Sequence, residues 1–212
     1  MVATQTLFFQ KLAEMTDLNY LKSYLTYLVS PVITGIKPLS LLNLQNNHRP
    51  LVLMWEQEGE DFLQKHQLEQ YVVKKSNKTL KLFIYNKSIL ERYLRKPHNL
   101  HFLRQFGYSG NAPLEEYLSY LKIRWKDSTF PHESGLFMGI PIKDIQGYLG
   151  NKTPIFQGYW LVYSDEKQKR DIFHLYDQSK MLIMDLIMEG REANNKLKDI
   201  FSEKQKDLYK NL

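Results

Sequence analysis

Cysteine is absent from this chain of 212 residues. Its absence excludes disulfides, thiolate metal sites and cysteine nucleophiles. A chain without disulfides suits a reducing compartment, so we expect a cytoplasmic protein. His98 and His101 stand three residues apart, but two histidines alone do not make a metal site, and we predict no bound metal.

Long hydrophobic runs are also absent. The longest uncharged stretch, residues 23–36, has fourteen residues and is broken by Pro31 and Gly35. A membrane-spanning helix needs about 20 apolar residues, so we predict no membrane span. The amino terminus has no basic flank before an apolar run, and Lys11 and Glu14 interrupt it, so we predict no signal peptide.

The composition is that of a globular protein with an excess of positive charge. Hydrophobic residues make up 43% of the chain and charged residues 25%, which is typical of folded domains. The formal net charge of +6 favours anionic partners without requiring nucleic acid. Because we find no repeat or linker, we predict one domain over residues 1–190 and a charged helical tail over residues 191–212. The sequence leaves the oligomeric state open.

Hydrophobic periodicity predicts an α/β (α+β) fold in which helices pack on a small mixed sheet of about four strands. The strands are expected near residues 39, 70, 80 and 157. Two β-rich runs, residues 69–75 and 79–85, predict a hairpin with Leu80, Leu82 and Ile84 on one face.

Apolar residues at helical spacing predict the main helices. One helix begins at Asp17 and should end or kink at Pro31, and a long helix is expected over residues 164–190. Residues 51–63 fit a helix, although the run LVLMW at their start also fits a strand.

The segment FPHESGLFMGIP, residues 130–141, has the character of a functional site. His132 and Glu133 lie between a proline and a glycine, a setting that exposes an imidazole and a carboxylate together. We take them as the candidate catalytic acid/base pair. The alternative is structural, with His132 bonded to a backbone carbonyl and Glu133 capping a helix or pairing with a lysine.

No familiar catalytic signature is complete in this segment. A zinc-protease helix needs a second histidine four residues after the first, where Leu136 stands. A hydrolase nucleophile elbow needs a glycine two residues before the serine, where the chain has His132. Four glycines lie in or after it: Gly135, Gly139, Gly147 and Gly150. They do not match a phosphate loop, but they allow an anion to approach the helix start near Ile142; their alternative role is in turns and caps.

Residues 69–96 combine basic and aromatic side chains. The cations are Lys74, Lys75, Lys78, Lys81, Lys87, Arg92, Arg95 and Lys96, and the aromatics are Tyr71, Phe83, Tyr85 and Tyr93. Nucleic-acid-binding sheets use this mixture to stack bases and pair phosphates, so binding of RNA or single-stranded DNA is one hypothesis. The alternative is a solvated strand face over core aromatics, and no RNP-like motif occurs.

Five blocks of the sequence resemble one protein family. They are SPVITGIKPLSLLNL (30–44), LKLFIYN (80–86), FLRQFGY (102–108), FPHESGLFMGIPIKDIQGYL (130–149) and GYWLVYSD (158–165). Over nearly its whole length the chain resembles the bacterial domain-of-unknown-function family 3793, found mainly in anaerobic Gram-positive bacteria. Its members commonly carry a cysteine near Gln178 or Ser179, where this chain has none. The resemblance implies no established activity.

These patterns together predict a cytoplasmic binding or accessory protein whose His132 loop holds a small anionic ligand or a partner protein. The expected ligand-binding residues are His132, Glu133, Ser134, Gly135, Gly139, Tyr159 and Trp160. The alternatives are an enzyme that uses His132 and Glu133 as acid and base, and the nucleic-acid-binding protein described above. The sequence leaves any cofactor open.

Overall fold

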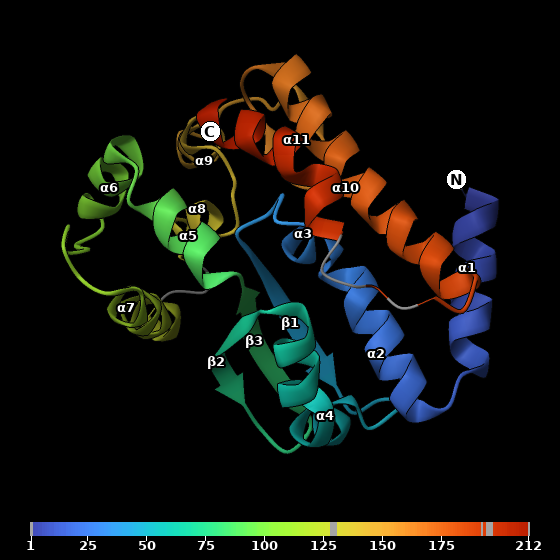
Figure 1. Ribbon diagram of the computed structural model, residues 1–212. Coiled ribbons are helices and arrows are strands. Elements are labelled where there is room, and N and C mark those ends of the chain that lie inside the picture. The colour runs from blue at the N-terminus through green and yellow to red at the C-terminus, as the bar shows by residue number, and fades with distance from the viewer. Residues whose placement is uncertain (1, 128–130, 192, 194–196, 212) are drawn as a thin grey trace.

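The computed structural model describes residues 2–127, 131–191, 193 and 197–211, and its centre is a three-stranded antiparallel sheet. In spatial order the strands are β1 (Leu39–Gln45), β3 (Thr79–Tyr85) and β2 (Glu69–Lys75). The predicted hairpin is confirmed as β2 and β3, whose register shifts between Val72 and Lys74. Helices lie on both sides of the sheet (Figure 1).

Strand β3 is buried on both of its faces. Successive side chains of a strand point to opposite faces of the sheet. Leu80, Leu82 and Ile84 lie together in one core, as predicted, while Phe83 and Tyr85 lie in another. This double burial explains why β3 is an almost continuous apolar run.

One face of the sheet is covered by helices from both ends of the chain. These are α1 (Val2–Glu14), α2 (Asp17–Leu28), α3 (Ser30–Ile33), α4 (Leu51–His66) and α10 (Glu166–Met188). In Figure 1 the long helix α10 runs beside α1 and α2, and its Ile183 and Ile187 share a core with Phe8 and Leu25.

The helices of the middle of the chain lie on the other face. They are α5 (Lys87–Leu94), α6 (Pro97–Arg104), α7 (Leu114–Asp127), α8 (Ser134–Phe137) and α9 (Ile142–Leu149). Asn86 caps α5, because its Oδ1 accepts a hydrogen bond from the Ile89 backbone N–H at 3.1 Å. Leu136 and Phe137 of α8 are fully buried in this second core, which anchors the segment predicted as a site.

A third core joins the carboxyl-terminal half of the chain. A two-stranded sheet of β4 (Phe156–Gln157) and β5 (Leu161–Val162) packs on α10, and so does α11 (Leu197–Asn211). Phe201 and Leu208 of α11 are buried there, so α11 docks on the rest of the chain. Among the described residues, no helix has both the length and the apolar character needed to cross a membrane.

The predicted class, a single α/β domain, is confirmed, whereas the predicted sheet was wrong in two respects. The main sheet is antiparallel throughout, and the strand expected near residue 157 forms its own hairpin with β5. The Gly158 N–H donates to the Trp160 carbonyl at 3.0 Å, which closes a tight turn where a continuous strand was expected. Residues 51–66 form a helix and not a strand; the side chain of Asn46 accepts a hydrogen bond from the Val52 N–H at 2.8 Å in its first turn.

The turn at Gly158 sits directly on the ring of Phe173 in α10. We expect Gly158→Ala to lower the free energy of unfolding by about 1–3 kcal/mol, because the added methyl would overlap this ring. Urea denaturation measures the change. Gly110→Ala is the matched control, since its methyl meets only the end of the exposed Arg104 side chain. Equal losses in the two variants would contradict the packing account.

Candidate functional site

The two neighbouring residues of the predicted acid/base pair lie in different surroundings. His132 is exposed at the surface, whereas Glu133 is 0% exposed and accepts hydrogen bonds from Arg124. Tyr108 Oη lies 3.5 Å from the same carboxylate. The charge of Glu133 is therefore held in the interior by an arginine and is not offered to a ligand beside His132. Phe130, the first residue of the predicted segment, lies outside the described residues.

His132 lines a hollow between α8, α9 and the β4-β5 hairpin. The hollow has a volume of about 370 Å³. Its lining residues are three ring-bearing side chains, three aliphatic ones, a glycine and a carboxylate: His132, Tyr148, Trp160, Ile140, Ile145, Leu161, Gly135 and Asp144. The centroids of the His132 and Tyr148 rings are 5.4 Å apart, and Tyr148 is 52% exposed, so the two rings stand at the mouth. We call this cavity the aromatic hollow.

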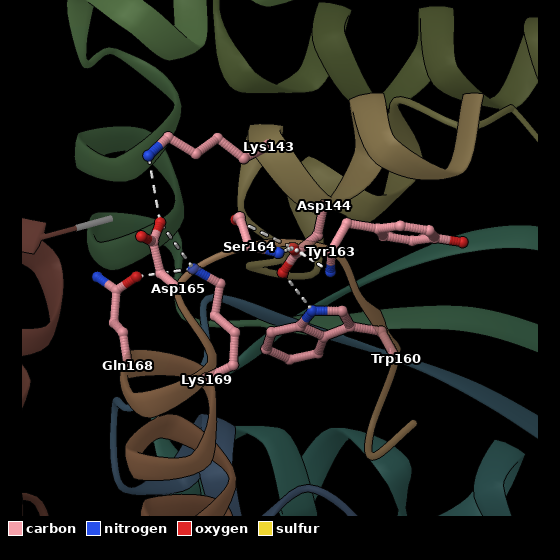
Figure 2. A network of polar contacts seen from close by, with 8 residues as sticks. All are labelled: Lys143, Asp144, Trp160, Tyr163, Ser164, Asp165, Gln168 and Lys169. Carbon is pink, nitrogen blue, oxygen red and sulfur yellow. Dashed lines mark hydrogen bonds and ion pairs between the residues drawn. The ribbon is translucent and has the colours of Figure 1, made fainter. Parts of the chain in front are cut away.

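Asp144 fixes one wall of the aromatic hollow. Its carboxylate is 1% exposed and points to the hairpin, as Figure 2 shows. Oδ2 accepts a hydrogen bond from Trp160 Nε1 at 2.8 Å. Oδ1 accepts from the backbone N–H groups of Tyr163 and Ser164 at 2.9 and 3.1 Å, and from Ser164 Oγ at 3.3 Å. Bonds to a buried carboxylate are among the strong hydrogen bonds in proteins, so they hold the indole in a fixed orientation.

Local sequence explains why Asp144 can occupy this position. Pro141 precedes the first turn of α9, and Asp144 lies in that turn, where the helix dipole favours a negative charge.

Lys169 is 1% exposed on α10 and donates to Gln168 Oε1 at 2.7 Å (Figure 2). Burial lowers the pKa of Lys169, and the negative charges of Asp144 and Asp165 partly offset this effect.

The remaining predicted ligand residues are not among those that line the aromatic hollow. Ser134 is fully buried, and its Oγ makes no hydrogen bond with the described residues. Gly139 has φ +83° in the turn after α8, where an added Cβ would be 2.9 Å from Pro38. Tyr159 points elsewhere, because its hydroxyl donates to Asp177 Oδ1 at 2.7 Å. Of the seven predicted residues, the hollow brings together three: His132, Gly135 and Trp160.

The basic hairpin does not present its aromatics for base stacking. Phe83, Tyr85 and Tyr93 are buried, and Tyr71 lies 3.0 Å from the Ser119 hydroxyl. These positions fit the alternative of core aromatics beneath a solvated face. In the described part of the chain, no group of three or more His, Asp or Glu side chains is arranged to hold a metal ion.

The sequence reasoning missed Asp144 and Tyr148. Both occur in the block PIKDIQGYL, in which only the glycines have a local pattern that points to a site. A carboxylate in a first helical turn has an ordinary structural role, so nothing local marks its burial. The available signal was the joint occurrence of this block with GYWLVYSD, because the two blocks contact each other through Asp144.

Residues 25–197 match the model of a family described as Protein of unknown function (DUF3793). No curated protein and no solved structure matches the chain significantly.

We expect Asp144→Asn to lower the free energy of unfolding by about 2 kcal/mol, because an amide cannot accept all four bonds and loses the charge that strengthens them. The Trp160 indole should also become more mobile and more accessible to solvent, because its hydrogen bond to residue 144 weakens. Chemical denaturation and tryptophan emission in a variant that keeps only Trp160 measure both effects. Asp171→Asn is the control, since this carboxylate is exposed on the surface of α10. A loss no greater than that of the control would refute the role given to Asp144.

Proposed function

Since the chain belongs to the DUF3793 family, whose description assigns no activity, we propose a function from the geometry of the aromatic hollow. The protein binds a small, flat, aromatic molecule that is neutral or positively charged. The observation that carries this proposal is the grouping of the His132, Tyr148 and Trp160 rings around a cavity of about 370 Å³.

Size and lining support a small-molecule ligand. Binding pockets for small molecules have volumes of about 300–1,000 Å³, mostly apolar walls and a few polar groups that set orientation. The aromatic hollow lies at the small end of this range, with aliphatic walls from Ile140, Ile145 and Leu161. Ring-bearing side chains favour a planar partner, because stacked and edge-to-face contacts stabilise aromatic pairs.

The charge of the residues that line the aromatic hollow disfavours the anionic ligand expected from the sequence. No lysine or arginine is among the described residues that line the aromatic hollow, and Asp144 contributes a carboxylate. Aromatic faces and a carboxylate attract organic cations, whereas an anion would meet an unfavourable field. We therefore prefer a neutral or cationic ligand to an anionic one.

Binding is preferred to catalysis because the candidate groups are already engaged. Glu133 is buried against Arg124, so it is not available to exchange a proton beside His132. Asp144, the carboxylate that shares the hollow with His132, accepts four hydrogen bonds. The cysteine-free composition favours a cytoplasmic setting for this binding protein.

Three ligands that share an indole ring but differ in charge test whether the aromatic hollow prefers neutral or cationic ligands to anionic ones. Indole is neutral, tryptamine is a cation and indole-3-acetate is an anion at neutral pH. We expect indole and tryptamine to bind, with indole-3-acetate about tenfold weaker than tryptamine because Asp144 repels it. Isothermal titration calorimetry gives the three dissociation constants. Tightest binding of indole-3-acetate would reverse the proposed charge preference.

His132→Ala locates the binding. Removing this ring should weaken tryptamine binding about tenfold, which is the usual scale for losing one stacking partner. His101→Ala is the matched control, because His101 is exposed on α6 and does not line the hollow. Equal affinities of the two variants would place any binding outside the aromatic hollow.

A further inference from the structure

Two lysines lie over a pair of contacting tyrosine rings where α10 meets the β4-β5 hairpin. Lys37 Nζ lies 5.9 Å from the centre of the Tyr176 ring, and Lys180 Nζ lies 4.5 Å from the centre of the Tyr159 ring. The two tyrosine rings contact each other edge to face, with centroids 5.1 Å apart. Lys37 lies in the turn before β1, and Tyr159 lies in the β4-β5 hairpin. Tyr176 and Lys180 lie on α10.

Neither ammonium group is neutralised by a carboxylate. Among the described residues, no carboxylate oxygen lies within ion-pair distance of Lys37 or Lys180, and neither amine donates a hydrogen bond to them. Both side chains are half-buried, so each amine has lost part of its hydration. Asp177 is the nearest acidic influence, and its Oδ1 accepts the Tyr159 hydroxyl at 2.7 Å. Two partly desolvated cations without a counter-ion favour an external anion.

We propose that Lys37 and Lys180 bind a small oxyanion of the sulfate or phosphate type. The anion accepts hydrogen bonds from both ammonium groups, on the side of each amine that does not face a tyrosine ring. This site is separate from the aromatic hollow and does not depend on the function proposed for it. It also gives a place to the anionic ligand suggested by the basic composition.

The electrostatics of the lysine pair set the pH dependence of this binding. Burial lowers the pKa of Lys37 to about 8, and the positive charge of Lys180 contributes in the same direction. Burial lowers the pKa of Lys180 as well, while Asp177 opposes the shift. The hydroxyls of Tyr159 and Tyr176 stay protonated, because burial raises the pKa of both. Lys37 is therefore charged below pH 8, and the affinity for an anion should fall as the pH rises through that value.

The experiment titrates the whole protein with sodium sulfate, an anion that does not itself titrate near pH 8. Shifts of the Lys37 and Lys180 backbone amides in ¹H–¹⁵N NMR spectra report binding at the site. At pH 7, we expect Lys37→Met and Lys180→Met each to weaken sulfate binding about tenfold, the scale of one charge-assisted hydrogen bond. Inorganic phosphate should compete for the same site.

The control variant is Lys78→Met, which removes one exposed positive charge on the β2-β3 turn and should change the affinity less than twofold. Lys37→Arg and Lys180→Arg keep the charge and should retain binding. If one methionine variant fails to fold, the other decides alone. The proposal would be overturned if Lys78→Met lost as much affinity as Lys37→Met and Lys180→Met. It would also be overturned if sulfate caused no shift of the Lys37 and Lys180 backbone amides. His132→Ala should leave sulfate binding unchanged, which separates this site from the aromatic hollow.

Discussion

The hydrogen bonds of the buried Asp144 carboxylate hold together the carboxyl-terminal half of the molecule. A buried charge is costly unless it is fully hydrogen-bonded, and Asp144 meets this condition with the Trp160 indole, two backbone N–H groups and the Ser164 hydroxyl. It thereby ties α9 to a hairpin whose strands have only two residues each. Such a short hairpin is not stable alone. The wall of the aromatic hollow exists because this carboxylate holds it.

Close packing around Asp144 explains why glycines and a tryptophan occur in the sequence blocks 130–149 and 158–165. Gly158 lies against the Phe173 ring, and Gly147 lies against Tyr163, so neither position has room for a side chain. Trp160 reaches Asp144 on one side and stacks edge to face on Phe173 on the other, with centroids 4.5 Å apart. Gly147, one of the four glycines considered for an anion cradle, therefore permits close packing between α9 and the segment after β5, and Gly158 permits close packing between the hairpin and α10.

Local patterns predicted the elements well, because helix periodicity and turn chemistry are properties of adjacent residues. The β2-β3 hairpin, predicted from residues 69–75 and 79–85, is an example. Contacts between elements were less accessible: Asp144 meets donors sixteen to twenty residues later in the chain, and no local pattern encodes such a pairing. His132 was identified as a site residue from its loop, but the sequence did not reveal that Glu133, its neighbour, turns inward to Arg124.

The placement of α10 and α11 has a consequence for how the chain folds. The core on one face of the sheet joins Phe8 and Leu25 to Ile183 and Leu197, residues that are far apart in the sequence. During synthesis, α1 and α2 expose the apolar surface of this core until α10 has left the ribosome. Contacts of such long sequence separation slow folding, because a large loop must close before they contribute. The chain therefore needs protection from aggregation longest at its amino-terminal helices.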